Sequence, residues 1–251
     1  MLKELRALHQ AGLVNKETPK CIFPETLIFN EGWLLRLVLK EWLSGSAGPG
    51  FGFLPFPEGV TAYSEGQLYT PFRAGSRRES NTHVDGIVGD FSITDTKSGV
   101  VLKPDLRYVA AFEAKLYAPI GRGVTNARWY DQVSRTAACL INSILLVEPR
   151  GNYAAHLAVL YSEDNHRIDP DLYTMDHFQR QISSRLEGFL ETGEPGDAVE
   201  RFASGWKDVL QRLHVWFLTW EDALENIHSD ELRGFYDRCK EFAHQLGATE
   251  S

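Results

Sequence analysis

Two stretches of the chain predict neighbouring strands of a sheet: residues 83–93, HVDGIVGDFSI, and residues 106–117, LRYVAAFEAKLY. Both are rich in β-branched, aromatic and other apolar residues, which favour strands. The turn-forming residues 97–99 (KSG) lie between them, so we expect the two strands to pair as an antiparallel hairpin. The second stretch is almost wholly apolar before its charged residues, which indicates a buried strand.

The segments around this hairpin predict an α/β protein in which a helix and three strands are followed by a helix, a strand and further helices. An apolar stripe at helical spacing predicts a helix over residues 31–43, and alternation predicts a first strand over 62–69. A helix over 130–147 and a strand over 153–161 follow the hairpin, and the continuous apolar run of that strand indicates burial on both faces. The remaining expected elements are helices over 170–192, 198–212, 221–228 and 230–245 and a strand over 213–220.

The composition is that of one folded domain of 251 residues, with 43% hydrophobic and 24% charged residues. No apolar run approaches the roughly 18 residues that a membrane span requires, so no membrane is expected as a partner. The first ten residues predict an amphipathic helix and no signal peptide. Cys21, Cys139 and Cys239 are far apart, which argues against a disulfide framework and a zinc site and favours a cytoplasmic location.

Charge is distributed unevenly along the chain, whose formal net charge is −8. Residues 71–135 contain ten Lys or Arg and seven Asp or Glu, a local balance of +3. Residues 161–251 contain nine and nineteen, a balance of −10. The basic residues therefore gather around the predicted hairpin, although a variation of this size can also arise by chance.

Three charged residues of the hairpin can converge on one place. Side chains two positions apart on a strand share a face, so Glu113 and Lys115 project together, and strand pairing can bring Asp85 beside Glu113. Two carboxylates about 4 Å apart repel by about 4 kcal/mol at an effective dielectric constant near 20, and a divalent cation such as Mg²⁺ reverses this cost. Such a site suits phosphodiester hydrolysis, because the metal activates water and the lysine stabilises developing negative charge.

Two alternatives compete with this interpretation. The three residues could be solvated on an exposed sheet face, but ionised residues in an apolar strand are seldom present for stability. Another aspartate could take the first role, but Asp90 has the opposite strand parity to Asp85. Asp105 lies roughly 26 Å from Glu113 along an extended strand.

The sequence HVDG around Asp85 and the sequence EAK at residues 113–115 resemble the motifs of the PD-(D/E)XK, or restriction-endonuclease-like, nuclease superfamily. The resemblance implies a core of helix, three strands, helix and strand around a mixed central sheet over about residues 24–162. A helical C-terminal extension would then occupy about residues 163–251 of the same domain. One departure is that Val84 stands where the motif has Pro.

The resemblance also implies the roles of individual residues. Asp85, Glu113 and the backbone carbonyl of Ala114 would bind Mg²⁺ or Mn²⁺, and Lys115 would act in catalysis. The 28 positions between Asp85 and Glu113 then require a long hairpin.

The superfamily often has a further metal-site glutamate on its first helix, and Glu31 lies on the core-facing stripe of the expected helix. The alternative for Glu31 is a favourable charge at a helix N-terminus, and Glu25 and Glu65 are rivals for the role. Some members of the superfamily use a glutamine after the third strand to contact substrate or water, which suggests Gln132. A solvated polar face is the alternative for Gln132.

Basic residues near these motifs are candidates for contacts with nucleic-acid phosphates. Arg128, Gln132 and Arg135 lie on one stretch and are expected to share one helical face. His83 shares a strand face with Asp85 and could position water or a metal, but packing is its more common role. The remaining candidates are in the stretch PFRAGSRRES, although a cluster of three charges is more often just an exposed loop: Arg73, Arg77 and Arg78.

These observations lead us to expect a metal-dependent nuclease that acts on nucleic acid, with DNA favoured, in restriction, repair or defence. A homo-oligomer, or partner subunits that supply recognition or motor activity, would be consistent with it. One alternative is a catalytically inactive nucleic-acid-binding or assembly module on the same fold. Another is a metal-dependent phosphoesterase with a small substrate. The sequence does not decide between DNA and RNA or between endonuclease and exonuclease activity.

Overall fold

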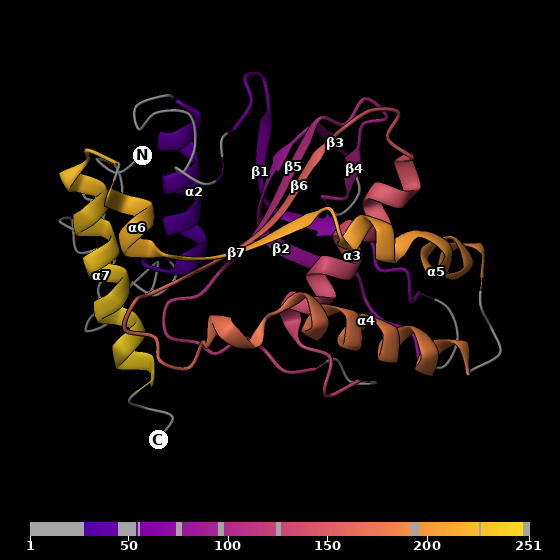
Figure 1. The fold of residues 1–251 in the computed structure, drawn as a ribbon. Helices are drawn as coiled ribbons and strands as arrows, with labels where there is room; N and C mark the ends of the chain where they lie inside the picture. The colour runs from indigo at the N-terminus through magenta and orange to yellow at the C-terminus, as the bar shows by residue number, and fades with distance from the viewer. Residues whose placement is uncertain are drawn as a thin grey trace.

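The computed structural model describes residues 28–44, 54, 56–73, 77–94, 98–123, 127–191, 196–225 and 227–247. At its centre is a five-stranded sheet with the strand order β1-β2-β5-β6-β7 and helices on both faces (Figure 1). The β1–β2 and β2–β5 pairs are antiparallel, and the β5–β6 and β6–β7 pairs are parallel. The chain is therefore an α/β protein with a mixed sheet, as the sequence predicts.

The elements follow one another in nearly the expected order. The strands of the main sheet are β1 (Thr61–Leu68), β2 (Thr82–Gly89), β5 (Tyr108–Ala114), β6 (Ala154–Tyr161) and β7 (Leu213–Thr219). A separate two-stranded sheet consists of β3 (Phe91–Ile93) and β4 (Val100–Leu102). The helices are α2 (Glu31–Leu43), α3 (Gln132–Val147), η2 (Pro170–Leu172), α4 (Met175–Leu190), α5 (Asp197–Leu210), α6 (Trp220–Glu225) and α7 (Asp230–Gly247).

The predicted antiparallel pairing of the two motif-bearing stretches is confirmed, but the prediction of one continuous strand over residues 83–93 is wrong. The strand is divided after Gly89, where the φ angle is 152° and a Cβ atom would lie 2.4 Å from the Tyr108 carbonyl oxygen. The next residue, Asp90, turns away and forms an ion pair of 2.9 Å with Arg107. The turn predicted at residues 97–99 joins β3 to β4, and Lys97 is outside the described residues.

The sheet separates two apolar cores. Val109 and Ala111 of β5 belong to the core under α3, α4 and α5, whereas Ala110 and Phe112 belong to the core under α2, α6 and α7. Every residue of β5 is buried. The apolar run of β6 is explained in the same way, since a strand covered by helices on both faces has no solvated side.

The C-terminal part of the chain is mostly helical, but it is not a helical appendage. It contributes β7, which pairs with β6 in parallel from Leu213 to Thr219. Figure 1 shows α4 and α5 on the same side of the sheet as α3, and α6 and α7 beside α2. No helix among the described residues is long and apolar enough to cross a membrane.

Candidate active site

Asp85 and Glu113 lie opposite each other at the end of the β2–β5 ladder. The last paired residues of that ladder are Gly86 and Phe112, and Asp85 and Glu113 are one step further along the same register. Asp85 Oδ2 accepts a hydrogen bond of 2.6 Å from the Ala114 backbone N–H. Lys115 Nζ lies 3.9 Å from Glu113 Oε2. The structure therefore brings together the three residues at the centre of the sequence hypothesis.

A local break in β1 lies across from Asp85. Residues Ser64 and Gly66 pair with Gly86 and Val84, but the position between them, Glu65, has a left-handed φ of 58°. The β1–β2 register skips that one step, where Asp85 would be the partner. Asp85 thus sits beyond the end of one ladder and at a gap in the other.

Glu113 is almost fully enclosed, and α3 holds both of its carboxylate oxygens. Gln132 Nε2 donates to Oε2 at 2.7 Å, and Thr136 Oγ1 donates to Oε1 at 2.7 Å. Gln132 and Thr136 are four positions apart and therefore share one helical face. The sequence hypothesis included Gln132 but missed Thr136, although its i+4 spacing from Gln132 was a usable signal.

The acidic side chains of this site have raised pKa values. Burial and, less strongly, the charge of Asp85 together raise the pKa of Glu113 to about 8, although Lys115 opposes the shift. Burial also raises the pKa of Asp85, and Lys115 and the Ala114 N–H counteract it. The nearby positive charges, chiefly that of Lys115, therefore oppose the effect of burial on these carboxyl groups without cancelling it.

Glu31, at the start of α2, also belongs to this group of charges. Burial raises its pKa, the charge of Lys115 lowers it and the charge of Asp85 raises it again. Its rival Glu65 is turned toward α2 and lies 3.5 Å from Arg36 Nη2. The other rival, Glu25, is outside the described residues.

The donor atoms of the site fit a hard divalent cation. In an extended strand the N–H and C=O of one residue point the same way, so the Ala114 carbonyl points toward the Asp85 side. Two carboxylates and a carbonyl suit Mg²⁺ or Mn²⁺, which keep several waters as ligands. No group of three or more His, Cys, Asp or Glu side chains in the described part of the chain is arranged to hold a metal. The carboxylates of Asp85 and Glu113, which lie opposite each other, are the candidate side-chain ligands.

Two of the arginines suggested for phosphate contact are engaged within the protein. Arg135 Nη2 donates to the Ser80 carbonyl at 2.7 Å, and its Nε lies 3.6 Å from Glu79. Arg77 Nη1 donates to the Gly188 carbonyl at 2.6 Å, which ties the loop before β2 to α4. Both arginines therefore have a role in holding the fold.

The other suggested arginines are exposed. The Arg73 guanidinium lies 5.6 Å from the centre of the Tyr69 ring, and Arg78 is in the following loop. Arg128 lies in a turn before α3, because Asp131 caps that helix and Gln132 is its first residue. The prediction that Arg128 shares a helical face with Gln132 and Arg135 is therefore wrong.

A polar hollow of about 300 Å³ is lined in part by Gln132, whose side chain also donates to Glu113. No acidic side chain of the described residues lines it, whereas Arg135 and His83 do. His83 Nε2 lies 3.0 Å from Gln67 Nε2, and this contact gives it a partner other than a metal. Trp129, which directly precedes the lining residue Tyr130, is 48% exposed. The full lining is Asn81, Thr82, His83, Gly121, Gly123, Tyr130, Gln132 and Arg135.

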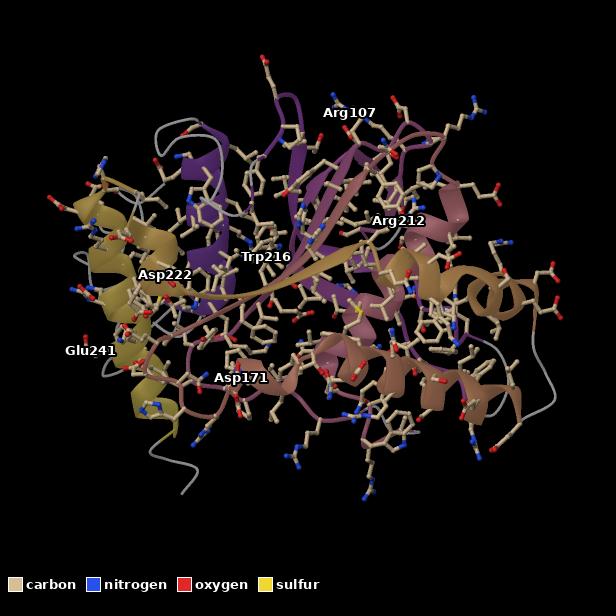
Figure 2. All side chains as sticks on the ribbon, in the orientation of Figure 1. Arg107, Asp171, Arg212, Trp216, Asp222 and Glu241 are labelled. Atoms are coloured by element: carbon tan, nitrogen blue, oxygen red, sulfur yellow. The ribbon has the colours of Figure 1, made fainter. Side chains whose placement is uncertain are left out.

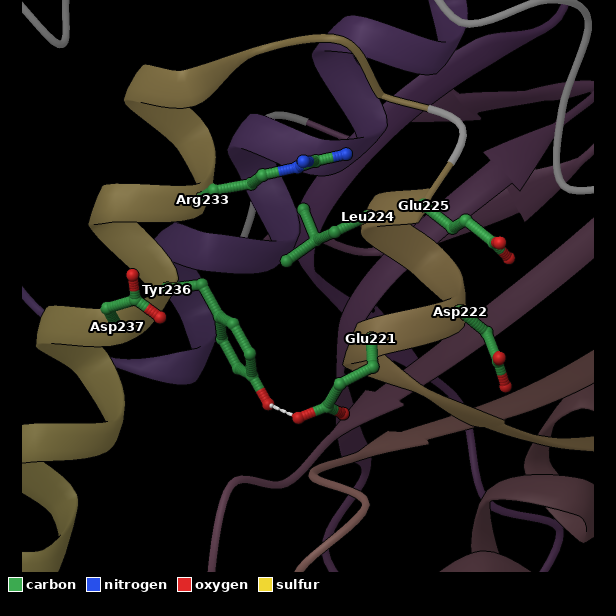
Figure 3. A pocket seen from close by; sticks show the side chains of 7 residues that line it. All are labelled: Glu221, Asp222, Leu224, Glu225, Arg233, Tyr236 and Asp237. Carbon is green, nitrogen blue, oxygen red and sulfur yellow. Dashed lines mark hydrogen bonds between the residues drawn. The ribbon is translucent and has the colours of Figure 1, made fainter.

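A larger hollow of about 510 Å³ lies between α6 and α7 and has the opposite character (Figure 3). A hydrogen bond from Tyr236 to Glu221 crosses it. Arg233 is the one basic residue in a lining that otherwise carries four carboxylates. This surface disfavours a polyanion, in contrast to the hollow beside Gln132. Its lining residues are Glu221, Asp222, Leu224, Glu225, Arg233, Tyr236 and Asp237.

No protein-family model matches the chain, and neither a curated protein nor a solved structure matches it significantly. The functional argument therefore depends on the site itself and on the two motifs that resemble a nuclease superfamily. Fold alone does not identify a reaction, because one fold can carry many chemistries.

Proposed function

We propose that this protein is a metal-dependent nuclease that hydrolyses phosphodiester bonds in DNA with Mg²⁺ or Mn²⁺, on a restriction-endonuclease-like core. The observation that carries the proposal is the placement of Asp85 opposite Glu113, with Lys115 3.9 Å from Glu113, at the end of a central buried strand. The order α2, β1, β2, β5, α3 and β6 is also compatible with such a core.

The proposed roles follow from the contacts of each side chain. Asp85, Glu113 and the Ala114 carbonyl would hold the cation. A divalent cation bound there would neutralise the phosphate and activate water for attack. Lys115, whose side chain is only 12% exposed, would stabilise the negative charge that develops on the phosphate. Gln132 and Thr136 would keep the Glu113 carboxylate in one orientation.

The hollow beside Gln132 supports a path for the substrate strand. Its amide, hydroxyl and basic groups suit phosphate and sugar oxygens, and none of its described lining residues has a carboxylate to repel them. Arg122 and Arg128 are exposed beside it, and the exposed Trp129 ring could stack on an unpaired base. The acidic hollow is formed by α6 and α7, which lie beside α2, whereas Gln132 begins α3 on the other side of the sheet (Figure 1).

The proposal is tested by incubating the purified chain with duplex DNA, single-stranded DNA, RNA and p-nitrophenyl phosphate. We expect DNA cleavage that requires Mg²⁺ or Mn²⁺ and is lost with EDTA. Asp85→Asn should abolish cleavage, whereas Asp105→Asn, which changes an exposed carboxylate in the turn before β5, should not. Turnover of p-nitrophenyl phosphate alone would favour a small-substrate phosphoesterase. DNA binding without cleavage under all metal conditions would favour an inactive module.

The catalytic role proposed for Lys115 can be tested separately from the metal-binding role proposed for the carboxylates. Lys115→Met should lose most cleavage because the ammonium is removed from the developing charge, yet it should retain Mn²⁺ binding. Calorimetric titration measures the binding, with Asp85→Asn as the variant expected to lose it. If both variants lose Mn²⁺ binding equally, Lys115 acts by holding the carboxylates in place.

A further inference from the structure

The outer edge of β7 has no strand partner among the residues that the structure describes. β7 is the last strand of the sheet and pairs only with β6. In Figure 1 it crosses the front of the molecule between α6 and α5. The N–H and C=O groups of alternate residues point outward from such an edge, so it can serve as a template for another strand.

The opposite edge of the sheet, at β1, is protected against pairing with another strand. On β1, Gln67 N–H donates to the Ser98 carbonyl at 2.9 Å, and Gln67 also forms a bridge with Gly99. The left-handed backbone of Glu65 interrupts the extended edge and places a charge there. Among the described residues, the β7 edge has neither such a contact nor such a break in its backbone. Its sequence LHVWFLT also contains no Pro, Asp, Glu, Lys or Arg. Proteins commonly use such residues to prevent edge pairing.

The surroundings of β7 are apolar and partly exposed. Val215, Trp216 and Phe217 are half-buried in the isolated chain. Tyr173 packs against Phe217 with ring centres 4.9 Å apart, and the neighbouring Leu172 is 62% exposed. A strand placed along this edge would therefore cover apolar side chains as well as backbone groups.

We propose that β7 pairs antiparallel with β7 of a second copy of this chain, so that the two sheets join about a two-fold axis near Trp216. In that register Leu213 of one copy is opposite Thr219 of the other. Arg212 then reaches the level of Trp220, where the first turn of the partner's α6 carries Asp222. Both Arg212 and Asp222 are exposed, and Figure 2 shows them at opposite ends of β7.

The two-fold symmetry makes the Arg212–Asp222 contact twice in each dimer. These pairs fix the antiparallel direction, since a parallel arrangement would place Arg212 near Arg212 and Asp222 near Asp222. They also offset locally the repulsion between two chains that each carry a net charge of −8. The inference does not depend on the nuclease proposal.

Sedimentation velocity on the full chain tests the dimer. We expect a concentration-dependent dimer below about 100 µM. Arg212→Glu and Asp222→Arg should each raise the dimer dissociation constant about tenfold or more, because each turns two attractive contacts into repulsive ones. Lys103→Glu and Glu241→Arg make matched charge changes at exposed positions away from β7 and should leave the constant unchanged.

The decisive measurement mixes the two single variants. A heterodimer of Arg212→Glu with Asp222→Arg has two opposite-charge pairs, so the mixture should dimerise about as tightly as the wild type, whereas each variant alone dimerises about tenfold or more weakly. This rescue also shows that both variants are folded. A wild-type chain that remains monomeric at about 100 µM would overturn the proposal. So would a dimer that ignores both substitutions, or a mixture that remains monomeric.

Discussion

Two glutamates, Glu79 and Glu113, are buried to the same extent, with side chains only 1% exposed, and neighbouring residues of α3 serve them. Arg135 lies 3.6 Å from Glu79, and Thr136 donates to Glu113. Glu79 also forms an ion pair with the buried Arg185 of α4. Its negative charge therefore meets two guanidinium groups, one on each of two helices.

Glu113 has a different environment. Its ion-pair partner, Lys115, is 3.9 Å away, Arg135 acts on it only through its charge, and the half-buried carboxylate of Asp85 opposes its ionisation. A buried carboxylate with two cations can serve the fold, whereas one placed beside another carboxylate is a cost to it. Residues that lower the stability of the fold in this way are found most often at functional sites. This difference indicates that Glu79 serves stability, and it supports the proposed catalytic role of Glu113.

The largest expected effect is on activity. Glu113→Gln should lower the DNA cleavage rate by about 10³-fold or more, because a charged candidate ligand becomes neutral. Its fold should be retained, since the amide keeps the shape of the side chain and relieves the repulsion from Asp85. Cleavage assays and circular dichroism on the same preparation check both parts. Near-normal cleavage would remove Glu113 from the site.

The next effect is on stability and concerns the other glutamate. Glu79→Gln should lower the free energy of unfolding by about 3–5 kcal/mol, because two guanidinium groups lose their buried counter-charge. Urea unfolding measures the loss. Glu191→Gln removes an exposed carboxylate 3.5 Å from Arg77 and should cost less than about 1 kcal/mol. Similar losses in the two variants would contradict the structural role of Glu79.

Strand periodicity was enough to predict the centre of this site. Asp85, Glu113 and Lys115 are close because side chains two apart share a face and because residues 83–93 and 106–117 pair, both of which follow from local pattern. The fold class and most element positions came from the same kind of signal. The division of β2 from β3 did not, because the short contact at Gly89 depends on the neighbouring strand.

The buried ion pairs of Glu79 with Arg135 and Arg185 could not be predicted from local pattern. Glu79 and Arg185 are 106 positions apart, and nothing in the stretch SRRES distinguishes a buried glutamate from an exposed one. Arg77 and Arg135 were interpreted as phosphate contacts because sequence reveals charge but not which partner folding brings to it. The edge position of β7 was also hidden, since strand order is a property of the whole sheet.

A third prediction concerns pH and the metal-free protein. The pKa of Glu113 is raised by burial and by Asp85 from near 4.5 to about 8, so the folded chain retains a proton that the unfolded chain releases. Stability is therefore full below about pH 4.5 and is lost as the pH rises toward 8, by up to about 1.4 kcal/mol per pH unit. Urea unfolding with EDTA should show a shallower decline for Glu113→Gln. An unchanged slope in that variant would contradict the shift.

The smallest effect expected is that of Thr136, which orients Glu113 without being a proposed ligand. Thr136→Val keeps the shape of the side chain but leaves Glu113 Oε1 without the hydroxyl donor 2.7 Å away. Groups that orient a metal ligand commonly change affinity by 10–100-fold, and because Gln132 still holds Oε2 we expect about tenfold weaker Mn²⁺ binding. Thr136→Ser restores the donor and should remain within about twofold of the wild type. Calorimetry separates this role from simple packing, because Thr136→Val preserves volume while Thr136→Ser removes a methyl group. If Mn²⁺ affinity follows volume and not the hydroxyl, Thr136 belongs with the structural residues of α3, as Arg135 does.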